Sequence, residues 1–159
     1  MNQDSPTILT RFWIVGDELN PDEFTRLVGL QPTGSGRKGD PSANPTARKL
    51  GRTVPKTFWE IEVERNSYNT DEGIQEILGL IWPRREVIVE FLKARPSVKA
   101  GFLLVVHIHH DPPAYEINRD SIQKLASLGC EFAMDDIYRS YEDEDENDSE
   151  RGMGAQHEP

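Results

Sequence analysis

The order in which strand-like and helix-like segments follow one another constrains this fold more than any other feature. Apolar alternation and apolar runs predict four strands, at residues 8–15, 57–65, 98–109 and 130–138. Apolar residues at helical spacing predict four helices, at residues 20–29, 71–81, 83–96 and 118–129. A long connection, residues 31–56, separates the first helix from the second strand and is rich in Pro, Gly and basic residues.

The ends of the helices are marked by residues with known positional preferences. Asn20 suits the cap of the first helix, Pro21 its first turn, and Gly29 its end. Asn118 suits the cap of the last helix, which is expected to carry the apolar residues Ile122, Leu125 and Ala126 and to end at Gly129. With these signals, the helix boundaries can be predicted more precisely than from apolar periodicity alone.

With the two middle helices set aside, the order is βαββαβ, which predicts an α+β fold with a ferredoxin-like antiparallel sheet. The two helices are then an insertion between strands 2 and 3, and the basic loop follows helix 1. The first and third strands are apolar on both faces, as the central strands of such a sheet should be. We therefore expect the second sheet face to be covered by the inserted helices, by the loop or by a second subunit.

Charge divides the chain into three parts. The tail from residue 141 holds eight acidic residues and one basic residue, a contribution of −7 to the formal net charge of −10. The loop at 31–56 holds six basic residues and one acidic residue, or +5. We predict an N-terminal arm at 1–6, one domain at 7–140 and a disordered acidic tail at 141–159. The loop is expected to meet an anionic partner or the tail itself.

Targeting signals are not apparent in the sequence. The longest apolar run, residues 100–106, is far shorter than the ~20 residues of a membrane helix. The first residues do not resemble an export signal, and the single cysteine, Cys130, excludes an internal disulfide. These features predict a cytoplasmic protein that does not associate with membranes.

Several short runs, in this order, resemble the bacterial family known as domain of unknown function 4279. They are Leu27-Val28-Gly29-Leu30-Gln31-Pro32, Lys38-Gly39-Asp40, Trp59, Leu128-Gly129 and Asp135-Asp136-Ile137-Tyr138. The resemblance spans nearly the whole predicted domain and implies a bacterial cytoplasmic α/β domain. It brings no established activity, and the acidic tail lies outside it.

The basic loop is the first candidate binding site. Its candidate ligand- or partner-binding residues are Arg37, Lys38, Asp40, Arg48, Lys49 and Arg52. Arginine and lysine pair with phosphate or carboxylate, and the nearby glycines let the backbone approach an anion. The run is not a Walker loop, since no Gly-Lys-Ser/Thr opens a helix. The alternative is a mobile, solvated loop without a fixed ligand.

The histidines suggest a metal site as an alternative. His107 and His109 lie on one side of the third strand and could bind one ion together with Asp111. A structural role for the histidines is the simpler interpretation, and no metal or other cofactor is expected. Cys130 is expected to be a small buried hydrophobic residue, and no catalytic residue is assigned.

Two clusters of acidic residues in the sequence are expected to have structural roles. Asp135 and Asp136 are adjacent on a strand and so point to opposite faces, where they would protect a sheet edge. Glu60, Glu62 and Glu64 form a solvated stripe, or else face the basic loop and hold it in place.

These observations favour a non-catalytic module that binds a protein partner through the loop and the adjacent sheet face, with an accessory or immunity-like role. One alternative is a small-molecule site or enzyme for a phosphate or carboxylate, with Arg37, Lys38 and Arg48 as clamps. Nucleic-acid binding through the loop is a second alternative, disfavoured by the negative net charge. A homodimer formed over the second sheet face is a further expectation.

Overall fold

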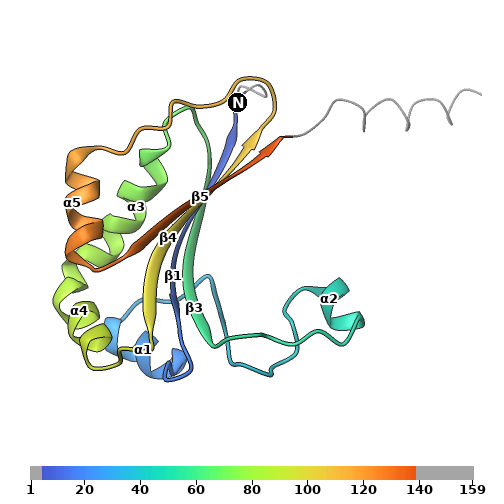
Figure 1. Cartoon of the computed structure of the whole chain (residues 1–159), viewed down its shortest axis with the longest axis vertical. Coiled ribbons are helices and arrows are strands. Elements are labelled where there is room, and N and C mark those ends of the chain that lie inside the picture. The colour runs from blue at the N-terminus through green and yellow to red at the C-terminus, as the bar shows by residue number, and fades with distance from the viewer. Residues whose placement is uncertain (1–4, 139–159) are drawn as a thin grey trace, which may run out of the picture.

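The computed structural model describes residues 5–138, which form one five-stranded sheet and a layer of helices (Figure 1). The strands are β1 (Thr7–Val15), β2 (Gly34–Gly36), β3 (Phe58–Asn66), β4 (Lys99–Ile108) and β5 (Glu131–Tyr138). The helices are α1 (Pro21–Val28), α2 (Pro45–Lys49), α3 (Asp71–Ile81), α4 (Arg85–Lys93) and α5 (Arg119–Ser127), with a 3-10 turn, η1 (Trp82–Arg84), between α3 and α4. The predicted α+β class is confirmed.

The predicted helix ends are confirmed by their caps. The Asn20 side chain accepts a hydrogen bond from the Glu23 backbone N–H, and Gly29 ends α1 at φ 67°, a conformation that favours glycine. The Asn118 side chain accepts a hydrogen bond of 2.8 Å from the Ser121 backbone N–H at the start of α5. Local sequence therefore fixes where these helices begin and end.

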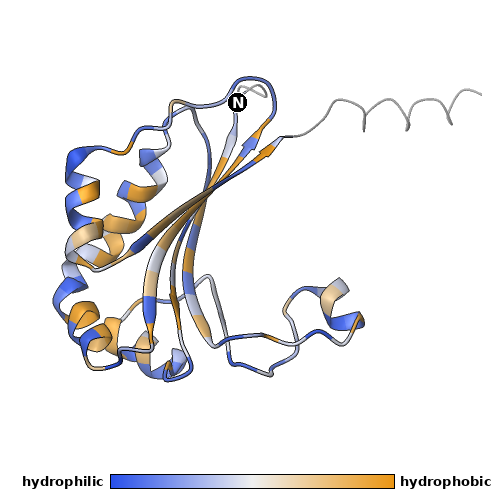
Figure 2. Cartoon of the chain, viewed as in Figure 1, coloured by the Kyte–Doolittle hydropathy of each residue, from blue (hydrophilic) through white to orange (hydrophobic). Residues whose placement is uncertain are grey.

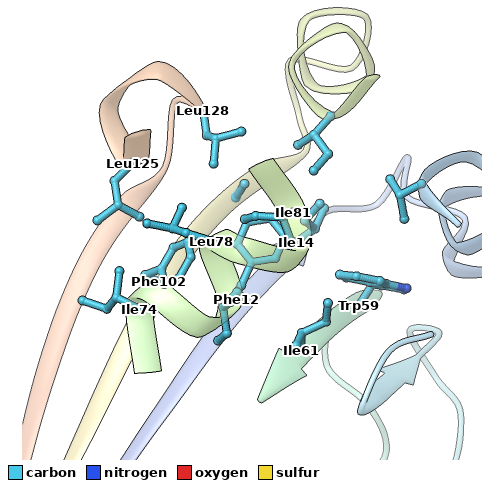
Figure 3. Packing of buried hydrophobic residues seen from close by; sticks show 14 of the residues in the cluster. Phe12, Ile14, Trp59, Ile61, Ile74, Leu78, Ile81, Phe102, Leu125 and Leu128 are labelled. Carbon is cyan, nitrogen blue, oxygen red and sulfur yellow. The ribbon is translucent and has the colours of Figure 1, made fainter. Parts of the chain in front are cut away.

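Helices α1, α3, α4 and α5 all cover the same face of the sheet, and the hydrophobic core lies between the two layers (Figures 1 and 3). From the sheet come Phe12, Trp59 and Phe102, each fully buried. Phe24 of α1 lies 5.0 Å from Trp59 and 4.9 Å from Phe91 of α4, measured between ring centroids. Burial of these aromatic rings supplies a large part of the folding free energy.

The strand order is β2-β3-β1-β4-β5, and this differs from the ferredoxin-like prediction. In a ferredoxin-like sheet the predicted second strand pairs with the third; here β3 pairs with β1 instead. The sheet is also mixed, because β4 and β5 are parallel. The ferredoxin-like antiparallel topology was therefore wrong, although β1 and β4 are interior strands, as expected for the two most apolar ones.

The connection between β3 and β4 explains the difference. Both strands run antiparallel to β1, one on each side of it, so they run in the same direction. Joining two such strands requires the chain to return along the length of the sheet, and α3, η1 and α4 provide that return. These helices are thus the crossover that determines the topology, and not an insertion into a hairpin.

The connection predicted as a basic loop contains structure of its own. Strand β2 adds to the outer side of β3, pairing Gly34 with Glu60. The chain then forms a two-sided projection, the basic arm (residues 37–56), which carries α2 near its tip. Figure 1 shows α2 on the side of the sheet opposite to the other helices.

The predicted domain limits extend past the described residues. Residues 1–4 and 139–159, which include the predicted acidic tail and most of the N-terminal arm, lie outside them. No helix within residues 5–138 combines the length and apolar character needed to cross a bilayer.

Candidate functional site

The second face of the sheet is not covered by any helix within residues 5–138, and we call it the open face (Figure 1). Its burial pattern shows this directly: along β1, buried side chains of the core face alternate with partly exposed side chains of the open face. The side chains considered below are Phe58, Glu60, Glu62 and Glu64 of β3, Leu9, Arg11, Trp13 and Val15 of β1, Leu103, Val105 and His107 of β4, and Ala133, Asp135 and Ile137 of β5. The expectation that the helices or the loop cover this face fails within the described chain.

Rows of paired residues show how the open face is composed. One row runs from Glu64 through Leu9 and Val105 to Asp135. Each central residue is apolar and each outer residue is acidic. Figure 2 shows apolar residues along all the long strands, although β1 and β4 bury only one face under helices. The row from Glu60 through Trp13 and Gly101 to Glu131 is similar, whereas the row between these two carries Arg11 on its central part and ends at Ala133. The apolar residues of the central strands form what we call the apolar stripe, Leu9, Trp13, Val15, Leu103 and Val105, with acidic residues on both outer strands.

The basic residue Arg11 lies within this surface, between two of its glutamates. Its Nη2 atom is 2.5 Å from Oε2 of Glu62, and its Nε atom is 3.4 Å from Oε2 of Glu60. Burial raises the pKa of the Glu60 carboxyl above its ordinary value, although Arg11 acts to lower it. Two residues of the predicted glutamate stripe, Glu60 and Glu62, thus pair with Arg11 on β1. Among residues 5–138, the side chains of Glu60, Glu62 and Glu64 make no ion pair with a basic group of the arm.

Trp13 is the largest apolar group of the open face. Its indole lies over Gly101 of β4, where an added Cβ would be only 2.3 Å from Cζ2 of the ring. Beside it lies a groove of about 480 Å3 lined by Arg11, Trp13, Val15, Pro55, Lys56, Phe58, Glu60 and Leu103. Because Pro55 and Lys56 belong to the arm, the groove joins the open face to the base of the arm.

Strand β5 forms the border of the sheet and is exposed along its whole length. It carries several exposed apolar side chains, Phe132, Met134, Ile137 and Tyr138, the last of which is 71% exposed. Asp135 and Asp136 occur on its two faces, and the Tyr115 hydroxyl donates a hydrogen bond of 2.9 Å to Asp136. The two carboxylates are separated by the strand, which agrees with the prediction that they form no acid/base pair.

At its base, the basic arm is held by polar contacts. The Arg37 guanidinium lies 2.6 Å from the Asp22 carboxylate, and the Lys38 Nζ atom lies 3.5 Å from that of Asp17. The Asp40 carboxylate accepts a hydrogen bond from the Arg37 backbone N–H. Three of the six predicted binding residues, Arg37, Lys38 and Asp40, therefore make contacts that shape the arm.

The remaining three predicted residues lie at the tip of the arm. Within residues 5–138, the side chains of Arg48, Lys49 and Arg52 make no hydrogen bond or ion pair. Between them lies Leu50, whose exposed fraction is 67%. The tip therefore presents three unpaired cations and one apolar side chain to solvent. The predicted residues thus fall into two groups, a paired one at the base of the arm and an exposed one at its tip.

The histidines are not arranged as ligands of a metal ion within residues 5–138. His107 lies on the open face, in register with Ile137, and the His109 Nε2 atom lies 3.3 Å from the Thr7 hydroxyl. Within residues 5–138, no group of three or more His, Cys, Asp or Glu side chains is arranged to hold an ion. Asp111 is not brought into such a group with His107 and His109.

The thiol of Cys130 is poorly suited to nucleophilic chemistry. Burial raises its pKa to about 12, so the thiol is protonated at neutral pH. Its side chain was predicted to be buried; it is partly buried and packs against the hydrophobic core.

One polar cluster was not predicted from the sequence. Asp71, 4% exposed, accepts hydrogen bonds from the side chains of Gln75 and Asn118, and its Oδ1 atom has no partner in the described structure. The nearby Thr70 hydroxyl donates to the Glu116 carbonyl at 2.7 Å. Although a polar hollow of about 460 Å3 adjoins it, the cluster serves to join the N-termini of α3 and α5. Asn118 could be recognised from the sequence only as a cap.

Comparison with known proteins agrees with the resemblance seen in the sequence. The family described as Domain of unknown function (DUF4279) matches residues 6–138, which is nearly all of the described fold. No curated protein and no solved structure matches the chain. The chain therefore belongs to the DUF4279 family.

Proposed function

We propose that this protein is a non-catalytic protein-binding module, an accessory or immunity-like protein of the bacterial cytoplasm, whose binding surface is the open face together with the basic arm. The observation that carries the proposal is the apolar stripe on the open face, which includes Leu9, Trp13, Leu103 and Val105. Apolar patches that are contiguous and bordered by polar residues mark interaction sites in soluble proteins.

The composition of the open face supports a protein as the partner. Interface centres are typically apolar and aromatic, with charged residues at the rim. Trp13 and Leu103 line the central groove, while Glu64 and Asp135 lie at opposite borders. An amphipathic surface with basic residues around an apolar centre would complement this arrangement.

The alternatives fit the geometry less well. A small anion requires convergent cations around a hollow, whereas Arg37 and Lys38 are already paired and Arg48 lies at the exposed tip. A nucleic acid lying along the arm would bring its phosphates near the acidic borders of the open face, which disfavours binding.

Affinity capture from the native cells with a matched pair of variants tests the proposal. Leu103→Gln/Val105→Thr makes the open face polar with residues that strands tolerate. Leu27→Gln/Ile122→Gln makes equally conservative changes at exposed positions of α1 and α5. We expect the first variant, with its fold verified by circular dichroism, to lose proteins that wild type and the second variant both retain. Identical sets of captured proteins for all three would contradict the proposal.

A further inference from the structure

The open face and the tip of the basic arm have opposite charges. The face carries five carboxylates, at Glu60, Glu62, Glu64, Glu131 and Asp135, and their only described ionic partners are Arg11 and Lys99. The tip carries Arg48, Lys49 and Arg52. Both surfaces also contain apolar side chains that are at least partly exposed, so their charges are complementary and their apolar groups can pack together.

Within one chain the two surfaces do not meet. Among residues 5–138, only Pro55 and Lys56, at the base of the arm, line the groove of the open face. The tip extends away from the sheet on the side of the open face (Figure 1). The tip therefore points toward the space that a molecule bound to the open face would occupy.

We propose that the occupant of the open face is a second copy of this chain, bound with two-fold symmetry so that each arm tip lies on the open face of the other copy. Leu50 would contact the apolar stripe, and Arg48 and Lys49 would approach Glu64 and Asp135. The proposal deepens the proposed function, since it names a partner for the same surface. Such a contact is self-complementary and closes as a dimer.

The dimensions of the arm agree with this arrangement. Its two sides are joined by backbone hydrogen bonds, including Gly39 N–H to Val54 O at 2.9 Å and Ser42 N–H to Arg52 O at 3.1 Å. The run from Gly39 to Asn44 contains a turn at Gly39 and bends at Asp40, Ala43 and Asn44. It therefore spans less than the ~20 Å of six fully extended residues, whereas sheets packed face to face lie ~10 Å apart. The length of the arm is thus of the order that a face-to-face dimer requires.

The acidic tail is the main competitor for the arm, because residues 142–150 carry seven carboxylates. The tail would complement the cations of the tip but not the acidic open face. Beyond residue 141 its only apolar residues are Met153 and Ala155, so it offers little to the apolar stripe. A second copy supplies a complement for both surfaces at once.

Sedimentation velocity on the full chain with two charge-reversal variants tests the proposal. The arm variant is Arg48→Glu/Lys49→Glu, and the face variant is Glu64→Lys/Asp135→Lys. We expect the wild type to dimerise at micromolar concentration and each variant to raise the dimer Kd at least about tenfold. An equimolar mixture of the two variants should dimerise again, because each altered surface then meets its complement in the other chain.

The controls give each outcome a meaning. Lys93→Glu/Arg119→Glu, at exposed helical positions on the other side of the sheet, should leave the dimer Kd unchanged. Recovery in the mixture also shows that both variants are folded. Specific interfaces of moderate affinity have dissociation constants well below ~100 μM. A wild type that is still monomeric at that concentration would therefore overturn the proposal. So would variants that dimerise normally, a mixture without recovery, or an effect of the arm variant alone, which would favour the tail. If proteins are captured through Leu103 and Val105 but no dimer forms, the proposed function stands and only this inference fails.

Discussion

At the scale of single residues, the open face contains a carboxyl group, that of Glu60, whose burial disfavours the charged form. Glu60 lies between β2 and Arg11, with 21% of its side chain exposed, and burial is the main cause of its raised pKa. A carboxyl whose pKa is higher in the folded state than in the unfolded state destabilises the fold when ionised. The destabilisation is present at neutral pH and is lost as the pH falls through the folded pKa.

Glu60→Gln should therefore raise the free energy of unfolding at pH 7. The advantage should shrink as the pH falls toward and below 4.5, the ordinary pKa of the carboxyl, because wild-type Glu60 is then neutral as well. Urea unfolding at several pH values measures this dependence. The control is Glu64→Gln, at an exposed position of the same strand, where we expect little change. A less stable Glu60→Gln protein at pH 7 would show that the ion pair with Arg11 outweighs burial.

At the scale of elements, helix α3 lies unusually close to the sheet at one position. An added Cβ at Gly73 would lie 2.2 Å from Oγ1 of Thr10 on β1, whereas one at Gly79 of the same helix would meet nothing within 4 Å. Both glycines are in a helix of eleven residues, so they differ chiefly in their surroundings.

This pair permits a matched test. Gly73→Ala should destabilise the protein by about 1–3 kcal/mol, because overpacking outweighs the better helix propensity of alanine. Gly79→Ala should stabilise it by up to about 1 kcal/mol, from propensity alone. Thermal and urea unfolding provide both values. Adding Thr10→Ala to Gly73→Ala should recover part of the loss, and equal effects at the two glycines would contradict the close packing of α3 on β1.

The sequence predicted individual elements better than their arrangement. Asn20 and Gly29 specify the ends of α1 locally, so that helix was predictable. The pairing of β3 with β1 depends on the direction in which α3 and α4 return the chain, which no local signal encodes. Of the apolar residues that marked α5 in the sequence, Leu125 is buried but Ile122 is 52% exposed, because the described fold places no element over that side of α5.

The candidate site was predictable only in part, for the same reason. The charge of the loop identified Arg48, Lys49 and Arg52, but their separation from Arg37 and Lys38 depends on contacts with Asp22 and Asp17 far away in the sequence. The apolar residues on both sides of β1 and β4 indicated that a second face needs a cover. Whether that cover belongs to the same chain could be decided only from the fold.

At the scale of the whole molecule, helices α1, α3, α4 and α5 lie on one side of the sheet, and the arm with α2 and the apolar stripe lie on the other. The proposed function requires that the open face is an interface in the working protein. The tryptophans of the protein are suitable probes of this interface. Trp13 lies on the open face and Trp82 directly follows the C-terminal end of α3, and both are partly exposed. Trp59 is fully buried.

Hydroxyl-radical footprinting with mass spectrometry tests this claim most directly. The rate of oxidation of each tryptophan would be compared between the protein in concentrated native lysate and the purified protein at nanomolar concentration. We predict that the oxidation rate of Trp13, divided by that of Trp82 in the same sample to correct for radical scavenging by the lysate, is several-fold lower in the lysate, by analogy with the exclusion of water from interface centres. Equal ratios in the two samples would mean that the open face remains exposed to water, and would contradict the proposed function.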